Sequence, residues 1–403
     1  MSSKWLSLEE ALAKALNAAT PIVETEEVSL FEANGRVLAQ DAIATLDVPP
    51  WDNSAMDGFA VNCGDLVDGT TLNIQGVITA GMEAATPLAP HSAFKIMTGA
   101  PVPPNADAVV MIENTATDGD SVKIQQLPKS GENIRRKAND IAVNDVLIKQ
   151  GTKLKAEHLM LLSSQGTSSV KVFRKLKVGI VATGSELAEP GKERLATQIF
   201  ESNRVGLSSI LHNENVEIID FGIVEDNEAS LRALFTKASA SVDVMVSSGG
   251  VSVGDADYVK DIINELGNID FWKIAVKPGK PFALGSINNT LFCGLPGNPV
   301  SSFVTAKLLV VPILKKMQGQ TGNAAPLFVN AKITRDIKRR AGRRDFQRAT
   351  MTKDDRGEWH VTPFKKQSSG VMTSITAANC LMVIHESIST LNEGDIVPVM
   401  PLY

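Results

Sequence analysis

The chain has 403 residues, of which 43% are hydrophobic and 21% are charged, with a formal net charge of -5 at pH 7. This profile is typical of a globular protein and excludes a disordered chain, and domains of roughly 100–200 residues predict about two to four of them. The acidic balance gives no general affinity for nucleic acid or an anionic membrane, so neither is expected as a partner.

The cysteines and the apolar runs predict the compartment. Cys63, Cys293 and Cys380 are far apart in the sequence, which favours a reducing compartment and argues against a disulfide framework or a thiolate zinc site. The longest apolar stretch, residues 304–314, is too short to span a membrane, and residues 1–19 lack the features of a secretory signal. A soluble, cytoplasmic protein is therefore expected.

The N-terminal part of the chain predicts a mixed domain that a second domain interrupts. Residues 1–19 have the pattern of an amphipathic helix, with Ser7 and Glu10 spaced as a capping box. From 46 to 140 the chain is rich in Gly, Pro and short alternating runs, which indicates a β-rich domain. Residues 141–174 return to mixed character, so we expect the β-rich domain to be inserted into a discontinuous first domain.

The second half predicts an α/β domain followed by a small β domain. Apolar strand candidates at 178–182, 216–221, 242–247 and 290–294 alternate with helical patterns, which is typical of a parallel sheet with right-handed crossovers. The remaining tail consists of short strands and predicts a small barrel or sandwich. The fold class is thus multidomain α/β plus β, with expected domains at 1–45 with 141–174, 46–140, 175–326 and 327–403.

Three polar, glycine-containing loops follow predicted parallel strands, at residues 183–186, 248–257 and 294–299. In an open parallel sheet, ligands bind outside the carboxyl ends of the strands. In the last loop, Asn298 is a favourable N-cap and Pro299 a favourable first helical residue, and such a helix start attracts phosphate. No dinucleotide fingerprint or P-loop is present, so a standard nucleotide enzyme is disfavoured.

Charged residues gather near these loops. The carboxylates of Glu186, Asp226, Asp255 and Asp257 could together hold Mg²⁺, although helix capping is an alternative for Asp255 and Asp257. A fifth carboxylate, Asp57, also fits a hairpin turn. Two groups of cations could attract an anion or lie on a solvated surface: Lys273, Lys277 and Lys280, and then Arg335, Lys338, Arg339, Arg340, Arg343, Arg344 and Arg348.

Five motifs, in order along the chain, give a resemblance to a known family. They are NSAMDG at 53–58, IMTGAP at 96–101, SSGGVSVG at 247–254, KPGKP at 277–281 and GLPGNP at 294–299. Together they resemble the molybdopterin molybdenumtransferases, the family of bacterial MoeA and of the gephyrin E domain. Phe59 stands where the family commonly has tyrosine, and residues 138–140 replace a more usual Gly-Glu-Asp.

The resemblance implies an enzyme that converts adenylylated molybdopterin and molybdate into molybdenum cofactor and AMP with a divalent cation such as Mg²⁺. It implies no other nucleotide cofactor, an elongated four-domain homodimer with an intersubunit cleft, and the molybdopterin adenylyltransferase as a candidate partner. Carried over by position, the catalytic residues are Asp57, Thr98, Glu186, Asp226, Asp257, Lys273 and Lys277. The substrate-binding residues are Asp140, Ser248, Gly249, Gly250, Pro296, Gly297, Asn298, Pro299, Arg348 and Ser369, and the metal ligands are Glu186, Asp226 and Asp257.

Two alternatives remain open at this point. Molybdopterin adenylyltransferases resemble this chain in the parallel-sheet domain alone, so the extra domains and the Asp57 motif favour insertion of molybdenum. A scaffold protein, as gephyrin also is, would need a partner-binding groove that the sequence does not display.

Overall fold

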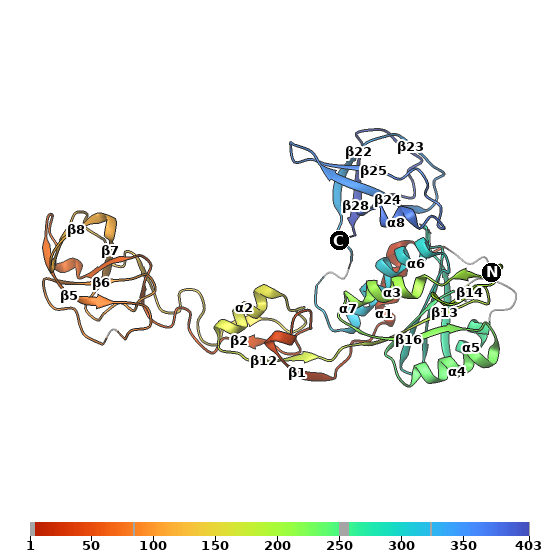
Figure 1. Cartoon of the computed structure of the whole chain (residues 1–403), viewed down its shortest axis with the longest axis horizontal. Coiled ribbons are helices and arrows are strands. Elements are labelled where there is room, and N and C mark those ends of the chain that lie inside the picture. The colour runs from red at the N-terminus through yellow and green to blue at the C-terminus, as the bar shows by residue number, and fades with distance from the viewer. Residues whose placement is uncertain (1–4, 84, 250–257, 323–324, 403) are drawn as a thin grey trace. The chain divides into compact units, whose positions relative to one another are not determined.

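The computed structural model describes residues 5–83, 85–249, 258–322 and 325–402. The chain forms two compact units, and each unit is built from segments that are separate in the sequence (Figure 1). Unit 1 contains Met1–Gln40, Gln150–Ala156 and Ser169–Tyr403, and unit 2 contains Asp41–Lys149 and Glu157–Ser168.

The central element of unit 1 is a six-stranded sheet. Its strands lie in the order β16 (Glu217–Val224), β13 (Lys177–Thr183), β17 (Val244–Ser248), β21 (Thr290–Leu295), β20 (Pro281–Ile287) and β18 (Gly267–Lys273). The first four strands are mutually parallel, as the apolar runs predict, whereas β20 and β18 add an antiparallel hairpin. The parallel-sheet α/β domain is therefore confirmed, and the hairpin is an addition that periodicity did not reveal.

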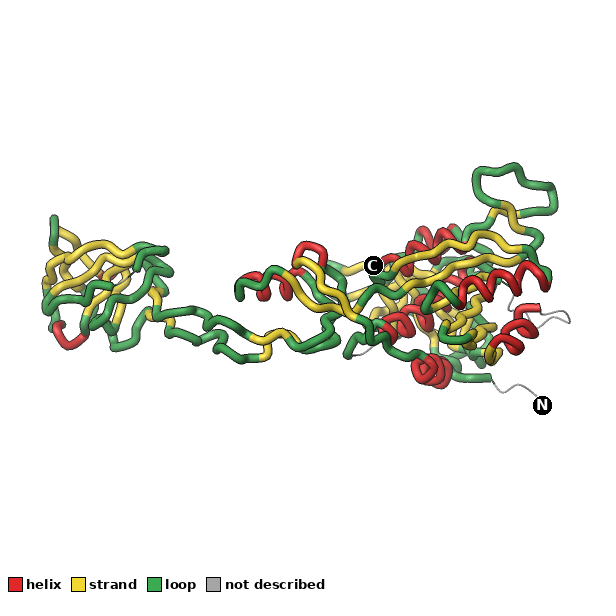
Figure 2. Tube along the Cα trace, turned by 90° about the horizontal axis from the view of Figure 1, so that it is seen from below, coloured by secondary structure: helices red, strands yellow, loops and turns green. Residues whose placement is uncertain are grey.

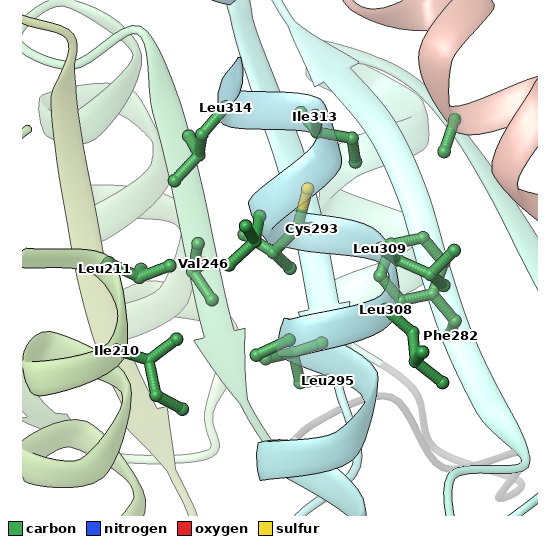
Figure 3. Packing of buried hydrophobic residues seen from close by; sticks show 14 of the residues in the cluster. Ile210, Leu211, Val246, Phe282, Cys293, Leu295, Leu308, Leu309, Ile313 and Leu314 are labelled. Atoms are coloured by element: carbon green, nitrogen blue, oxygen red, sulfur yellow. The ribbon is translucent and has the colours of Figure 1, made fainter. Parts of the chain in front are cut away.

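Helices cover both faces of this sheet, because alternate strand residues point to opposite faces. Val178 and Ile180 pack in a core with α1 (Leu8–Ala18), α3 (Asn203–His212), α6 (Pro299–Thr305), η4 (Ala306–Val310) and α7 (Val311–Met317). Val181 packs in a second core with α4 (Glu228–Ser239) and α5 (Tyr258–Leu266). Figure 3 shows the first core, to which Leu211 of α3, Val246 of β17 and Leu314 of α7 all belong.

Two local features of these helices follow from single residues. Ser7 and Glu10 form the predicted capping box, in which each side chain accepts from the other residue's backbone N–H, and α1 begins at Leu8. Pro312 has no N–H to offer the turn before it, and a π-helical turn, η4, lies there between α6 and α7.

The C-terminal part of unit 1 is a closed β barrel, which confirms the predicted small β domain. Its five strands are β24 (Arg344–Lys353), β25 (Trp359–Pro363), β22 (Val329–Ile333), β28 (Ile396–Pro401) and β26 (Cys380–Ile384), and β26 pairs again with β24 to close the ring. The short strand β19 (Val276–Lys277) joins β24 from outside. Smaller elements of unit 1 are β1 (Thr25–Ser29), η1 (Leu30–Glu32), β12 (Ser169–Phe173), β14 (Leu187–Ala188), β15 (Ile199–Phe200), β23 (Ile337–Lys338), α8 (Thr373–Thr376) and β27 (Thr390–Leu391).

Strands and loops make up most of unit 2 (Figure 2). Its six-stranded sheet has the order β7 (Ala108–Met111), β4 (Gly58–Val61), β6 (Ser92–Ile96), β5 (Thr71–Ile78), β9 (Ser121–Ile124) and β8 (Thr115–Asp118), with a buried cluster on each face. The other elements are β2 (Ala42–Ile43), β3 (Asn53–Ser54), η2 (Cys63–Asp65), η3 (Ile112–Asn114), β10 (Ile134–Arg135), β11 (Val146–Ile148) and α2 (Ala156–Ser164). Among the helices that the structure describes in the two units, none has the length and apolar character of a membrane span.

Candidate active site

Four parallel strands of unit 1 end at one edge of the sheet. β13 ends at Thr183, β16 at Val224, β17 at Ser248 and β21 at Leu295, and their pairing continues to these last residues. The loops that follow these strands carry, in the same order, Glu186, Asp226, Gly249 and the segment from Pro296 to Pro299. The sheet therefore brings the predicted polar loops to its carboxyl edge, the usual ligand-binding edge of an open parallel sheet.

Glycine is required where two of these loops approach each other. Gly249 has φ +91°, and a Cβ there would lie 2.6 Å from the backbone oxygen of Thr183. A Cβ on Gly297 would lie 3.8 Å from Cα of Gly249, so the two loops run close together. Gly250 and Asp257, which the sequence also predicts in this site, lie outside the described residues.

The side chains of Glu186 and Asp226 are exposed at neighbouring strand ends. Neither carboxylate makes a hydrogen bond or an ion pair with a residue in the described ranges. Between these loops, the hydroxyl of Thr183 is buried and has no hydrogen-bond partner in the described chain. A hard cation prefers oxygen ligands of this kind, so the donor set fits Mg²⁺.

The loop after β21 leads into α6 much as the sequence predicts. Asn298 occupies the N-cap position and Pro299 the first turn, and Ser302 N–H donates to the Asn298 carbonyl at 2.9 Å. The Asn298 side chain, however, makes no capping hydrogen bond. Its amide is exposed at the sheet edge, where it remains available to a ligand.

Asn203, a residue that the sequence analysis did not select, connects two of the loops. Its side-chain nitrogen donates to Ser248 Oγ at 2.7 Å and to the Gly297 carbonyl at 2.7 Å. The signal in the sequence is slight, because a polar residue at a helix start is more often a cap than a cross-link.

Arg204, which was also not predicted from the sequence, forms a buried charge network beside Asn203. It is 4% exposed, and its guanidinium donates to Glu189 at 2.6 and 2.7 Å, to Asp220 at 2.8 and 3.1 Å, and to Glu201 at 3.2 Å. Burial lowers the pKa of Arg204, but the hydrogen bonds and charges of the carboxylates outweigh burial and leave that pKa raised. The network thus holds the parallel strands β14 and β15, which follow Glu186, against β16 and α3.

The predicted cations of the site are brought in by β18, β19 and the barrel. Lys273 ends β18 and is half-buried, and Lys277 in β19 lies 3.6 Å from the buried carboxylate of Asp345 on β24. Arg348, further along β24, is 1% exposed and donates to Ser374 Oγ at 3.0 Å and to the Ser368 carbonyl at 3.1 Å. Burial lowers the pKa of Arg348.

Ser369 links this part of the barrel to α6, because its carbonyl accepts from Val300 N–H at 3.4 Å. The other arginines of the predicted cluster do not converge on one point. Arg335 and Arg339 donate to backbone carbonyls, and Arg344 pairs with Glu9 and Glu386. Arg348 is the member of this cluster that is buried, beside Ser368 and Ser374.

Three predicted site residues belong to unit 2. Asp57 Oδ1 accepts from Thr98 N–H at 2.7 Å and from Thr98 Oγ1 at 2.8 Å, because β4 pairs with β6 and sets the two motifs side by side. The backbone hydrogen bond, followed by the hydroxyl, lowers the pKa of Asp57. Asp140 is exposed, and its N–H donates to the Val48 carbonyl at 2.9 Å.

A cavity of about 310 Å³ lies in unit 1 beside the Asn203 end of α3. Its lining is mainly apolar and comes from α3, α6, η4, α8 and Leu402, which follows β28, with Asn203 and Pro299 also lining it. Lys307 also lines it, and burial lowers the pKa of this lysine.

Comparison with known proteins agrees with this architecture along nearly the whole chain. Residues 6–166 match the MoeA N-terminal region (domain I and II), residues 179–316 a probable molybdopterin binding domain, and residues 330–402 the MoeA C-terminal region (domain IV). The molybdopterin molybdenumtransferase of Haemophilus influenzae is 40% identical over 397 residues, 98% of each chain, and that of a Nostoc species is 34% identical over 94% of this chain and 89% of its own.

A solved structure with the same fold is the molybdopterin biosynthesis MoeA protein of Pyrococcus horikoshii. It is 30% identical, with a TM-score of 0.84, and the match covers 99% of this chain and 100% of that one. The family matches, the full-length relatives and the shared fold all agree with the five sequence motifs. The chain belongs to the MoeA family of molybdopterin molybdenumtransferases.

Proposed function

We propose that this enzyme inserts molybdenum from molybdate into adenylylated molybdopterin and releases AMP, with Mg²⁺ as its divalent cation. The relatives' name, molybdopterin molybdenumtransferase, describes the transfer of molybdenum to molybdopterin. The observation that carries the proposal is the convergence of the Ser248–Gly249 loop, the Gly297–Asn298 loop and two exposed carboxylates at one sheet edge.

Each group has a role that follows from charge. Backbone N–H groups around Gly249 and Gly297 and the start of α6 would bind the phosphates of the substrate, since free amides attract anions. Glu186 and Asp226, together with Asp257, would hold Mg²⁺, which when bound neutralises charge on the phosphoanhydride. Arg348, Lys273 and Lys277 would bind molybdate, also an anion, with Ser369 and Pro296 lining its approach.

Lys277 and Asp345 illustrate how the protein tunes this anion site. Asp345 is 2% exposed and its carboxylate lies 3.6 Å from Lys277 Nζ, and it also accepts from Gln347 at 3.0 Å. The pair is loose enough for the lysine to bind a second anion, because a 3.6 Å contact is longer than a well-formed charged hydrogen bond. Asp57, Thr98 and Asp140 would complete the site from unit 2, as a homodimer with a shared cleft allows.

The assembly and location are part of the same proposal. A homodimer would supply unit 2 of one copy to unit 1 of the other, and the molybdopterin adenylyltransferase would deliver its product to this enzyme. The three free cysteines are consistent with a cytoplasmic enzyme. Sedimentation of the purified protein at micromolar concentration tests the dimer directly, and a monomer at all concentrations would remove the shared-cleft part of the proposal.

The experiment that tests the reaction is AMP release from adenylylated molybdopterin and Mg²⁺, with and without molybdate. Molybdate-dependent release, with a product that activates a cofactor-free molybdoenzyme, is expected. Glu186→Gln should lower that rate at least tenfold, whereas Glu193→Gln, an exposed glutamate of the same connection, serves as the matched control.

The same assay separates the alternatives. The match to a probable molybdopterin binding domain is also compatible with a molybdopterin adenylyltransferase. A parallel reaction therefore contains molybdopterin and ATP as substrates. Pyrophosphate release there, without AMP release from the adenylylated substrate, would replace the proposal. No turnover with either substrate would favour a scaffold.

A further inference from the structure

Asn203 lies where two substrate loops must keep a fixed separation. β17 and β21 are paired up to Ser248 and Leu295, and Gly249 N–H donates to the Leu295 carbonyl at 3.2 Å. Beyond that point no further backbone hydrogen bond between the two loops is present among the described residues. The Asn203 amide links the two loops past this point. It donates one hydrogen bond of 2.7 Å to Ser248 Oγ and another of 2.7 Å to the Gly297 carbonyl.

The geometry of Asn203 suits a cross-link better than other side chains would. Both of its bonds use the two N–H donors of one amide nitrogen, so one rigid group spans both loops. The opposite loop offers a backbone carbonyl, which only a donor can satisfy. An aspartate of the same shape would place a negative charge against that carbonyl.

Asn203 is itself held from the other side. Glu201 Oε1 accepts from the Asn203 N–H at 2.6 Å and from the Arg204 N–H at 2.9 Å, so the carboxylate caps the first turn of α3. Glu201 and Arg204 are each 4% exposed, and Arg204 extends the network to Glu189 and Asp220. The start of α3 is thus fixed to the elements that carry Glu186 and Asp226.

We propose that Asn203 is a positioning residue, which sets the separation of the Ser248–Gly249 and Gly297–Asn298 loops and thereby the affinity for the adenylylated substrate. This inference rests on the proposed function, because that function assigns both loops to the substrate. Asn203 acts through the loops and takes no part in the chemical step. Loops that bind ground state and transition state alike change KM and leave kcat unaltered.

The first test is steady-state kinetics of Asn203→Ala. Loss of two hydrogen bonds should raise KM for adenylylated molybdopterin about 30-fold, with kcat and KM for molybdate within about twofold of the wild type. Asn203→Asp should raise the same KM at least as much. The control is Asn213→Ala, an exposed asparagine at the other end of α3.

A role in folding alone would give a different result. A smaller folded fraction lowers kcat per mole of protein and leaves KM unchanged, so that outcome would overturn the proposal. In a Ser248→Ala background, Asn203→Ala should raise KM by about tenfold or less, because one of its two bonds is already absent. Equal effects in both backgrounds would show that Asn203 does not act through Ser248.

A second measurement is independent of the reaction. Amide hydrogen exchange of Gly297, Asn298 and Val300 should be at least tenfold faster in Asn203→Ala than in the wild type, and unchanged in Asn213→Ala. Unchanged exchange in Asn203→Ala would refute the cross-link even if the protein acted on another substrate. Faster exchange in a protein without turnover would instead retain the cross-link and reject the proposed function.

Discussion

At the scale of single residues, the contact between Asp57 and Thr98 shows how two distant motifs act on one carboxylate. The residues are 41 positions apart, and the Thr98 N–H and then its hydroxyl lower the pKa of Asp57. Since the folded-state pKa lies below the unfolded one, these bonds stabilise the fold above the unfolded pKa. That stabilisation is lost as the pH falls through the lowered pKa.

Thr98→Val should raise the pKa of Asp57 only part of the way to its usual value. The substitution removes the hydroxyl donor and leaves the backbone N–H, which is the larger of the two causes. NMR titration of the Asp57 carboxyl carbon measures this, with Thr117→Val on an exposed strand of the same unit as the control. An unchanged titration would mean that the hydroxyl bond is absent in solution.

Asp57→Asn should abolish molybdate-dependent AMP release without unfolding the protein. The side chain is exposed, so its replacement leaves no buried group without a partner, and the amide keeps the shape of the carboxylate while removing its charge. AMP release and thermal unfolding are measured on the same preparation. Full activity in a folded variant would exclude Asp57 from the site.

The residues that sequence reasoning missed at this scale share a physical cause. Asn203 and Arg204 contact partners that come from other strands and loops. A sequence pattern records which residues can donate or accept. It does not record which strands become neighbours.

At the scale of secondary structure, the elements found from the sequence are those whose signal is local. The capping box at Ser7 and Glu10 and the apolar runs of β13, β17 and β21 depend on residues within one element. The pairing of β18 with β20 was not predicted from the sequence. β20 begins in a segment of prolines and lysines and is buried along much of its length, so its residues do not alternate between polar and apolar.

Ser7→Ala should lower the free energy of unfolding by about 1 kcal/mol. The alanine cannot accept from the Glu10 N–H, so one of the two hydrogen bonds of the capping box is lost. The other bond, from the backbone N–H of residue 7 to the Glu10 carboxylate, can still form. Urea unfolding followed by circular dichroism measures the change. Ser7→Asp keeps an acceptor at the cap and should stay near the wild type; equal losses in both variants would argue against capping as the cause.

Arg204→Met should lower the free energy of unfolding by about 3 kcal/mol, because it leaves the buried Glu201 without its cation. Arg232→Met is the matched control: this arginine also bridges two glutamates, Glu228 and Glu265, but on an exposed helix surface. Surface pairs contribute little, so a much smaller change is expected there. Similar losses in the two variants would contradict a special role for burial.

At the scale of the whole molecule, the fold class could be predicted from the sequence. The parallel sheet and the barrel each lie in one continuous stretch, so composition and periodicity were sufficient. The segments that share unit 1 are separated by more than a hundred residues and meet through pairings such as β1 with β12. The domain boundaries at 46 and 140 remain a prediction.

A fragment of residues 46–141 should fold cooperatively by itself. Both buried clusters of the β-rich sheet lie inside it, and Val48 N–H donates to the Ile141 carbonyl at 2.8 Å, which closes the ends of the fragment. Dispersed amide resonances and one unfolding transition are the expected observations. The shorter fragment 46–124 lacks β10 and should be less stable; an unfolded spectrum for the longer one would disprove these bounds.

The pairing of α1 with α7 has a consequence for the order of events during synthesis. The carbonyl of Leu16 accepts from Lys316 Nζ at 2.6 Å, a partner 300 residues later, and Ala11 and Ala15 are buried in the same core as Leu314. On the ribosome, all residues of unit 2 have been made once residue 168 has been added, whereas α1 keeps an uncovered apolar face until the residues of α7 follow about 300 positions later. This helix is thus made early and reaches its final place late.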